Sequence, residues 1–244
     1  MRTRVTLAAL VLGAACSLSP AAADDRVRVF VNGAFTPASL DYSQVRTFTQ
    51  FAEEGRIEST YSAEHGIGGE LGFQWTFHGH LGVAASVSFQ SRDAAVSFSA
   101  AFPHPLYLDH DRTASGTRDS LSYHETAGHL DLAYTTRSKG WQISLFAGPS
   151  LVSAKSDFVT DVPYTQSYPF DEVTVSGVTL GNSSDTAFGF NVGGGLDYRL
   201  SPKFGLGVQA RYTHATAQVA PAGGPTIDID AGGFQVAAGF RLFF

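Results

Sequence analysis

Hydrophobic and polar residues alternate along most of the chain with a period of two, the spacing of side chains on the two faces of a β-strand. Eight segments follow this pattern, and none carries a helical period. The segments are residues 27–35, 67–77, 80–90, 129–134, 141–151, 188–200, 204–213 and 233–244. The pattern predicts an all-β protein with eight antiparallel strands.

The polar face of these segments differs from that of a soluble sheet, which is usually dense in Lys, Glu and Thr. Here it is built from Gly, Ala and Ser with occasional Arg, Asp, Glu and Gln, and Lys occurs only at Lys139, Lys155 and Lys203. Only 16% of the 244 residues are charged, against roughly 25% in ordinary soluble domains. Small residues with a few large polar ones suit the narrow interior of a closed barrel.

The connections alternate in length, as they do in outer-membrane barrels. Residues 78–79, 137–140 and 201–203 are tight turns, whereas residues 36–66, 90–119 and 152–185 are long connections. Aromatic residues on the apolar face lie beside the tight turns, where a lower interfacial girdle is expected. They are Phe77, Tyr134, Trp141, Tyr198, Phe204 and Phe244. The prediction is an eight-stranded antiparallel up-and-down transmembrane β-barrel whose apolar face meets lipid.

Strand geometry gives a check on this register. A tilted strand climbs roughly 2.5 Å per residue along the membrane normal. Phe234 then lies about 25 Å above Phe244, at the top of an apolar band of about that height. Asp228 and Asp230, which share the parity of the apolar face, are therefore predicted to clear the lipid.

Residues 1–23 read as a Sec-type signal peptide, with Arg2 and Arg4 before an apolar run and small residues at 21–23. The barrel domain is then expected to span residues 24–244. Cys16 leaves a lipoprotein signal as an alternative, although the A-x-A cleavage pattern explains the segment without it. The net charge of −6 and the absence of a basic cluster argue against nucleic acid as a partner.

The last six residues, 239–244, resemble the C-terminal signal of Gram-negative outer-membrane proteins, because Phe244 follows apolar residues at every second position back to Phe234. With eight strands and a leader, the chain is similar to the small barrel family that includes OmpA-like transmembrane domains and opacity-type surface proteins. The resemblance implies a position in the outer membrane, among its lipid and lipopolysaccharide, with both termini in the periplasm. It also implies insertion by the barrel assembly machinery that reads Phe244.

Seven charged residues share the inward parity, and two interpretations of them stay open. They are Arg28, Glu70, Asp131, Asp197, Arg199, Arg211 and Arg241. They line a conduction path, or they form a packed and mutually neutralising polar core. The packed core is favoured, because eight strands leave an interior just wide enough for side chains to fill.

His214 and Thr216 raise an enzymatic alternative, since lipid A deacylases are similar barrels that use a His-x-Ser pair facing the outer leaflet. The match is loose, because Thr replaces Ser and Ala217 stands where Asn usually follows. Asp228 or Asp230 would have to orient the histidine. An interfacial histidine is the favoured interpretation.

Other histidines suggest a metal site only weakly. His78 and His80 flank a tight turn, and the Asp109-His110-Asp111 cluster with His104 lies in a long connection, where such residues are usually solvated. No catalytic, cofactor-binding or metal-binding residue is therefore predicted, and no cofactor is expected.

The long connections carry whatever specificity the protein has. Glu53-Glu54-Gly55 reads as the tip of a hairpin, surrounded by Phe48, Phe51, Ile57 and Tyr61. Further along, Tyr164, Tyr168 and Phe170 lie among acids, as contact residues or as loop packing.

Pro149 predicts a bulge or an early end of pairing in the fifth segment, because a closed barrel has no free edge for a proline. The predicted function is that of a non-catalytic structural or surface-interaction protein. The alternatives are a lipid A-modifying enzyme and a narrow channel.

Overall fold

The computed structural model describes residues 26–221 and 224–244, so the predicted leader, residues 1–23, lies outside the described residues. The elements are β1 (Val27–Thr36), β2 (Leu40–Gln50), β3 (Glu53–Ala63), β4 (Gly66–His78), β5 (Leu81–Pro103), β6 (Asp111–Ser138), β7 (Trp141–Asp161), β8 (Tyr164–Thr165), β9 (Thr174–Val175), β10 (Thr179–Arg199), β11 (Phe204–Val219) and β12 (Ile227–Phe243). No helix in this part of the chain is long and apolar enough to cross a membrane.

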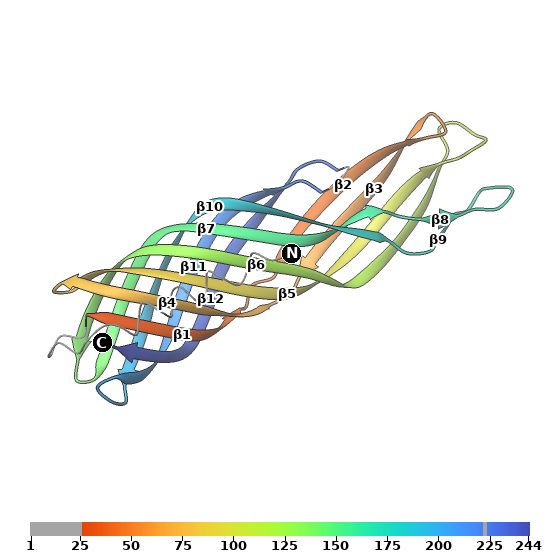
Figure 1. Ribbon diagram of the computed structural model, residues 1–244. Coiled ribbons are helices and arrows are strands. Elements are labelled where there is room, and N and C mark those ends of the chain that lie inside the picture. Colours follow the sequence, from red (N-terminus) through yellow and green to blue (C-terminus); the bar gives the residue numbers. More distant parts are fainter. Residues whose placement is uncertain (1–25, 222–223) are drawn as a thin grey trace, which may run out of the picture.

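Eight of the strands close into an antiparallel ring (Figure 1). Going round, β1 is followed by β4, β5, β6, β7, β10, β11 and β12, which pairs again with β1. The two ends of the ring meet at Val27 and Phe244, whose amides donate to each other's carbonyl oxygens at 3.0 and 2.9 Å. Each predicted segment lies within one of these eight strands, apart from one or two residues at some segment ends, so the fold class is confirmed.

The three predicted tight turns connect β4 to β5, β6 to β7 and β10 to β11, at the end of the ring where the chain finishes. The aromatic side chains beside them point outward. Those of Phe77, Tyr134, Trp141, Tyr198 and Phe244 are exposed, and Phe204 is partly covered by Phe240. The predicted aromatic girdle is therefore present at this end of the barrel.

The predicted long connections are wrong for residues 90–119 and 152–185, where the strands continue. β5, β6, β7 and β10 have 23, 28, 21 and 21 residues, whereas about 9–11 residues of tilted strand cross a membrane. β11 and β12 are shorter, with 16 and 17 residues, and they turn well below the far ends of β5 and β6 (Figure 1).

The two faces of these long strands exchange their character part-way along. On β5 the outward face is apolar from Leu81 to Phe89 and then turns to Ser91 and Asp93. The inward face is small and polar as far as Arg92 and then turns apolar from Ala94. The period of two therefore continues, but with reversed polarity, because the outer part of each strand is surrounded by water and packs on its own interior.

β2 and β3 form a hairpin that continues β1 and β4 outward, and β3 pairs with the far half of β5. The tip is a two-residue turn at Phe51 and Ala52, both with positive φ, the conformation of a type I′ turn. The predicted tip at residues 53–55 is therefore misplaced by two residues. Gly55 pairs with Phe48 inside the hairpin, and the Phe48 ring occupies the space that a Cβ at Gly55 would need.

Two β-bulges lie on either side of β5 at the level where its faces exchange. Glu64 and His65 add one residue opposite Asp93, and Asp119 and Ser120 add one opposite Ala95. Bulges bend a strand and shift its alternation by one residue. They keep the apolar side chains of β3 facing inward beyond the bend, together with Arg112 and Ala114 of β6. We call residues 40–63, 94–120 and 156–181 the outer extension.

Pro149 causes neither of the two predicted effects. β7 continues through it to Asp161, and the register of β6 on β7 is the same at His129–Ser150 and at Leu132–Ala147. Only residues 130–131 of β6 and residues 148–149 of β7, between these two pairs, are not paired with each other. The gap is local because proline lacks a single N–H donor while the flanking pairs hold the register.

Candidate functional site

Inside the part of the ring with an apolar outer face, charged side chains from facing strands meet in a buried network. Arg241 of β12 donates from Nε to Oδ1 of Asp197 on β10 at 2.7 Å, and Arg28 of β1 binds the other oxygen, Oδ2. The three side chains are at most 8% exposed. One carboxylate on β10 thus neutralises two guanidinium groups, one from β1 and one from β12.

The same network continues toward the outer end of the barrel. Asn32 accepts a hydrogen bond from Nη1 of Arg241 at 2.5 Å and donates one to Glu70 at 3.0 Å. Arg211 lies 2.9 Å from Oε1 of Glu70 and 3.5 Å from Oδ2 of Asp131. Six of the seven predicted inward charges are therefore brought together in one connected cluster, and the packed-core interpretation is confirmed for them.

Two inward aromatic rings pack against this network. The guanidinium carbons of Arg28 and Arg241 both lie 5.5 Å from the centroid of Phe30. That of Arg211 lies 5.0 Å from Phe146, a residue that breaks the apolar pattern of its segment because it points inward. Cation–π interactions with the arginines stabilise these aromatic rings in a charged interior.

Arg199, the seventh predicted inward charge, lies at the end of β10, near the turns. It is half-buried, and its guanidinium carbon lies 4.0 Å from the centroid of Phe243. Like the other inward arginines, Arg199 thus makes a cation–π interaction with an aromatic ring.

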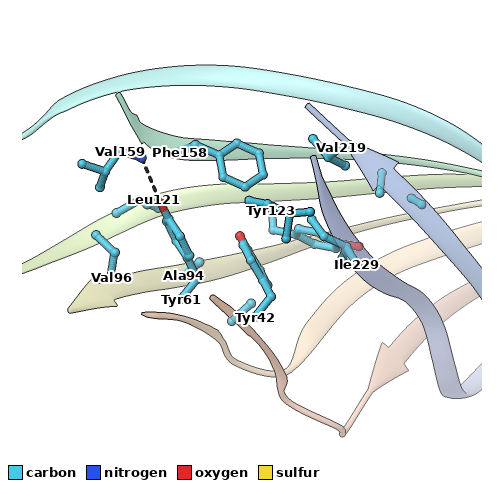
Figure 2. Packing of buried hydrophobic residues seen from close by; sticks show 14 of the residues in the cluster. Tyr42, Tyr61, Ala94, Val96, Leu121, Tyr123, Phe158, Val159, Val219 and Ile229 are labelled. Atoms are coloured by element: carbon cyan, nitrogen blue, oxygen red, sulfur yellow. Dashed lines mark hydrogen bonds between the residues drawn. The ribbon is translucent and has the colours of Figure 1, made fainter. Parts of the chain in front are cut away.

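The outer extension has an apolar interior instead (Figure 2). Tyr42 and Tyr61 stack with their centroids 4.8 Å apart, and Phe158 meets both rings edge-on at 6.0 and 5.6 Å. The Tyr61 hydroxyl accepts a hydrogen bond from the amide of Val159 at 2.8 Å. Burial raises the pKa of Tyr42 to about 12 and also raises the pKa of Tyr61.

This fold and the sequence together decide the family. The model of the outer membrane protein beta-barrel domain family matches residues 8–241, almost the whole chain. The chain belongs to this family. Its members lie in the outer membrane, so the apolar outer band of this barrel faces lipid and the outer extension projects from it.

Among solved structures, the outer membrane protein OprG from Pseudomonas aeruginosa is similar, with 14% identity, a TM-score of 0.54, and coverage of 90% of this chain and 96% of OprG. Neisserial surface protein A has 13% identity and a TM-score of 0.45, with coverage of 89% and 97%. The attachment invasion locus protein Ail of Yersinia pestis has 12% identity and a TM-score of 0.38, with coverage of 88% and 99%. No curated protein matches the sequence.

Likeness to OprG supports the barrel fold alone, since so low an identity carries no information on activity.

His214 of this outer-membrane barrel lies on the outward face of β11, opposite Gly232. Its ring packs on Phe190 with centroids 5.7 Å apart. Thr216, which would have to act as the nucleophile, donates a hydrogen bond from its hydroxyl to Asp230 at 3.2 Å. Asp230 is one of the two acids that could orient His214, so this acid binds the nucleophile directly. The three side chains are thus not arranged as a catalytic triad, in which the histidine lies between the other two.

His104, at the far end of β5, is buried, and its Nδ1 accepts hydrogen bonds from the amides of Leu106 and Tyr107 at 3.1 and 3.2 Å. Its Nε2 must then carry the ring proton and faces Asp171 at 3.7 Å. A protonated nitrogen does not ligate a metal. Within residues 26–221 and 224–244, no three His, Cys, Asp or Glu side chains are grouped to hold a metal ion.

The aromatic residues predicted in segment 157–185 divide between the two interpretations. Tyr164 belongs to the packing of the outer extension, with its ring 4.3 Å from Phe102 and its hydroxyl bound by Gln50 at 2.7 Å. Tyr168 is 81% exposed and contacts Phe170. Tyr168 is therefore the one of the three that is available for contact.

Sequence reasoning missed most of the outer apolar core. Ala94, Val96, Phe98, Ala100 and Phe102 alternate with polar residues, but they continue the inward parity of a segment whose apolar face points outward. The signal that would have found them is this exchange of faces at constant period.

Proposed function

We propose that this outer-membrane barrel is a non-catalytic surface protein, with both termini in the periplasm, that holds a rigid β-structured extension outside the cell for contact with other molecules. One observation carries the proposal. Strands of up to 28 residues exchange their apolar and polar faces without losing pairing, so the part beyond the lipid is built as a folded body with its own core.

The unequal ends of the barrel support the proposed orientation. The end with tight turns and the aromatic girdle corresponds to the periplasmic side of outer-membrane barrels, and the long end corresponds to the cell surface. The lipid-facing band then contacts lipid and lipopolysaccharide. Phe244, whose backbone closes the ring against Val27, is the residue that the assembly machinery would read.

The interior supports a structural role over a channel. Arg28, Arg211 and Arg241 are each at most 6% exposed, and they share the carboxylates of Glu70, Asp131 and Asp197 across the lumen. A hydrated ion would have to displace these paired charges, which costs several kcal/mol per uncompensated ion. We expect no discrete conductance steps when the purified protein is added to a planar bilayer.

The absence of catalysis is tested by mass spectrometry of lipid A from cells with and without the protein. We expect identical acylation patterns, because Thr216 is bound to Asp230 and is not paired with His214. An acyl change that disappears in His214→Ala would contradict the proposal, and the matched variant His124→Ala, on the exposed face of β6, controls for general loss of a surface histidine.

A further inference from the structure

The wall of the barrel is incomplete on one side of the outer extension. β12 pairs with β1 only from Val236 to Phe243, and from Ile227 to Gln235 it pairs with β11 alone. β2, which continues β1, pairs only with β3. Two unpaired strand edges therefore face each other above the lipid band, on the side where β11 and β12 are short (Figure 1).

A groove of about 470 Å³ lies between these edges, within the range of roughly 300–1,000 Å³ that is usual for binding sites. We call it the seam groove; it is lined by residues 41–45 of β2 and by Pro225, Thr226, Ile227, Asp228 and Asp230.

The base of the seam groove is closed by hydrogen bonds of Arg92. Arg92 donates to the carbonyl oxygen of Ala38 at 2.8 Å and to that of Gly232 at 3.3 Å, so it joins the start of β2 to β12. Gly232 and Gly233 both have φ near +100°, a conformation that favours glycine. β2 and β12 are thus joined at the base of the groove and are not paired with each other above it.

The charged side chains that line the groove are all acidic. Its charged lining residues are Asp41, Asp228 and Asp230, and no Lys, Arg or His is among the lining residues described. Arg46, the next residue on β2, turns to the other side and binds the carbonyl oxygen of Thr160. The electrostatic character of the groove is therefore acidic.

A buried donor also lacks a partner here. Gln44 is 3% exposed and lines the groove; its Oε1 accepts from the Tyr61 hydroxyl at 3.1 Å, but its Nε2 has no hydrogen-bond partner among the described residues. A buried amide donor without a partner destabilises the free protein. Gly224 lies beside this donor, and a ligand carbonyl oxygen that displaced Gly224 would satisfy it.

We propose that the seam groove binds an extended, cationic polypeptide segment, which adds as a strand to the free edges of β2 and β12. The backbone N–H and C=O groups of both edges supply the hydrogen bonds of strand addition. Asp41 and Asp228 select basic side chains at alternate positions, and Gln44 Nε2 binds a backbone carbonyl. This inference names the partner class for the surface-contact role proposed above and rests on it.

The test uses the mature protein in detergent micelles and a fluorescein-labelled peptide of four Lys-Val repeats, with fluorescence anisotropy as the readout. We expect saturable binding. The same peptide N-methylated at alternate residues keeps its charge but loses backbone donors, and we expect binding about tenfold weaker or more. A Glu-Val peptide is expected not to bind.

The site is assigned by two matched double variants. Asp41→Asn with Asp228→Asn is expected to weaken binding about tenfold. Asp109→Asn with Asp119→Asn removes the same charge from exposed positions outside the groove and is expected to change binding less than twofold.

Equal binding of the methylated peptide, equal loss in both double variants, or no saturable binding would overturn the proposal. So would a dimer that pairs through β2, detected by sedimentation. The surface location of the extension is measured separately on intact cells, so its failure is distinguishable from failure of peptide binding.

Discussion

At the residue scale, the barrel separates two kinds of interior by a few side chains. Arg92 is the last inward charge on β5, and Ala94 begins the apolar core. Below this level six buried charges pair with one another across the lumen, and above it the rings of Tyr42, Tyr61 and Phe158 pack together. The stability of the two regions therefore depends on different interactions and can be tested separately.

Asp197 is the position where the polar interior is most sensitive. Asp197→Asn leaves the guanidinium groups of Arg28 and Arg241 without their shared counter-charge, and we expect the free energy of unfolding to fall by about 3–5 kcal/mol. Urea unfolding in lipid vesicles, followed by fluorescence of Trp75 and Trp141, measures it.

The matched control is Glu58→Gln. This residue forms a 2.7 Å ion pair with Arg56 in which both side chains are 54% exposed, so a loss of about 0–1 kcal/mol is expected. Equal losses for the two variants would show that the buried network does not stabilise the barrel.

Tyr42 gives a pH-dependent signal from the outer core. Its pKa is about 12 in the folded protein and about 10 in an unfolded chain. Its contribution to stability is therefore fully present below pH 10 and is lost as the pH rises through 12.

In a titration followed at 295 nm, we expect late phenol ionisation from the buried tyrosines of the outer core, with an amplitude that falls by one phenol in Tyr42→Phe and is unchanged in the exposed-site control Tyr168→Phe. Ionisation of all phenols near pH 10 would contradict the buried stack.

At the element scale, the sequence was sufficient for the eight strand cores but not for their lengths. Residues 81–89 were predicted as a strand because apolar residues occupy every second position, as on the lipid-facing side of a membrane strand. Residues 94–102 keep the same period, but their apolar side chains are on the opposite face, so they did not extend the predicted strand. In addition, the bulges at residues 64–65 and 119–120 insert one residue into the alternation of inward and outward side chains. Such an insertion interrupts the period of two by which a strand is recognised in the sequence.

The candidate site was predicted in part for the same reason. Inward charges could be assigned from parity along each strand, and six of them meet. The seam groove could not be predicted, because it depends on where β1 and β12 stop pairing, and that is a property of two segments at opposite ends of the chain.

The bulge on β6 is expected to be required for the outer extension. Deleting Ser120, which has φ of +66°, would turn Arg112, Ala114 and Gly116 outward and bring Thr113 and Ser115 into the core. Limited proteolysis should then cleave within residues 104–120 much faster than in the wild type.

Ser120→Gly keeps the extra residue and tolerates the positive φ, so it should remain as resistant as the wild type. Equal resistance of the deletion variant would show that β6 has a different register there.

At the scale of the whole molecule, charge is distributed along the barrel axis. Arg137, Lys139 and Lys203 lie near the tight turns, whereas acids such as Asp41, Asp171 and Asp228 lie at the opposite end. The outer extension is thus acidic, and the rim at the end with the tight turns is basic. This polarity suits a protein whose outer end meets cationic partners.

The most direct test of the whole account is cysteine accessibility on intact cells, because the chain has one native cysteine, Cys16, within the predicted leader. Single variants Ser97→Cys, Val87→Cys and Lys139→Cys sample the outer extension, the lipid band and a tight turn. With a membrane-impermeant maleimide, we predict labelling at position 97, none at position 87, and labelling at position 139 only after the outer membrane is disrupted. Labelling at position 139 but not at position 97 on intact cells would contradict the account.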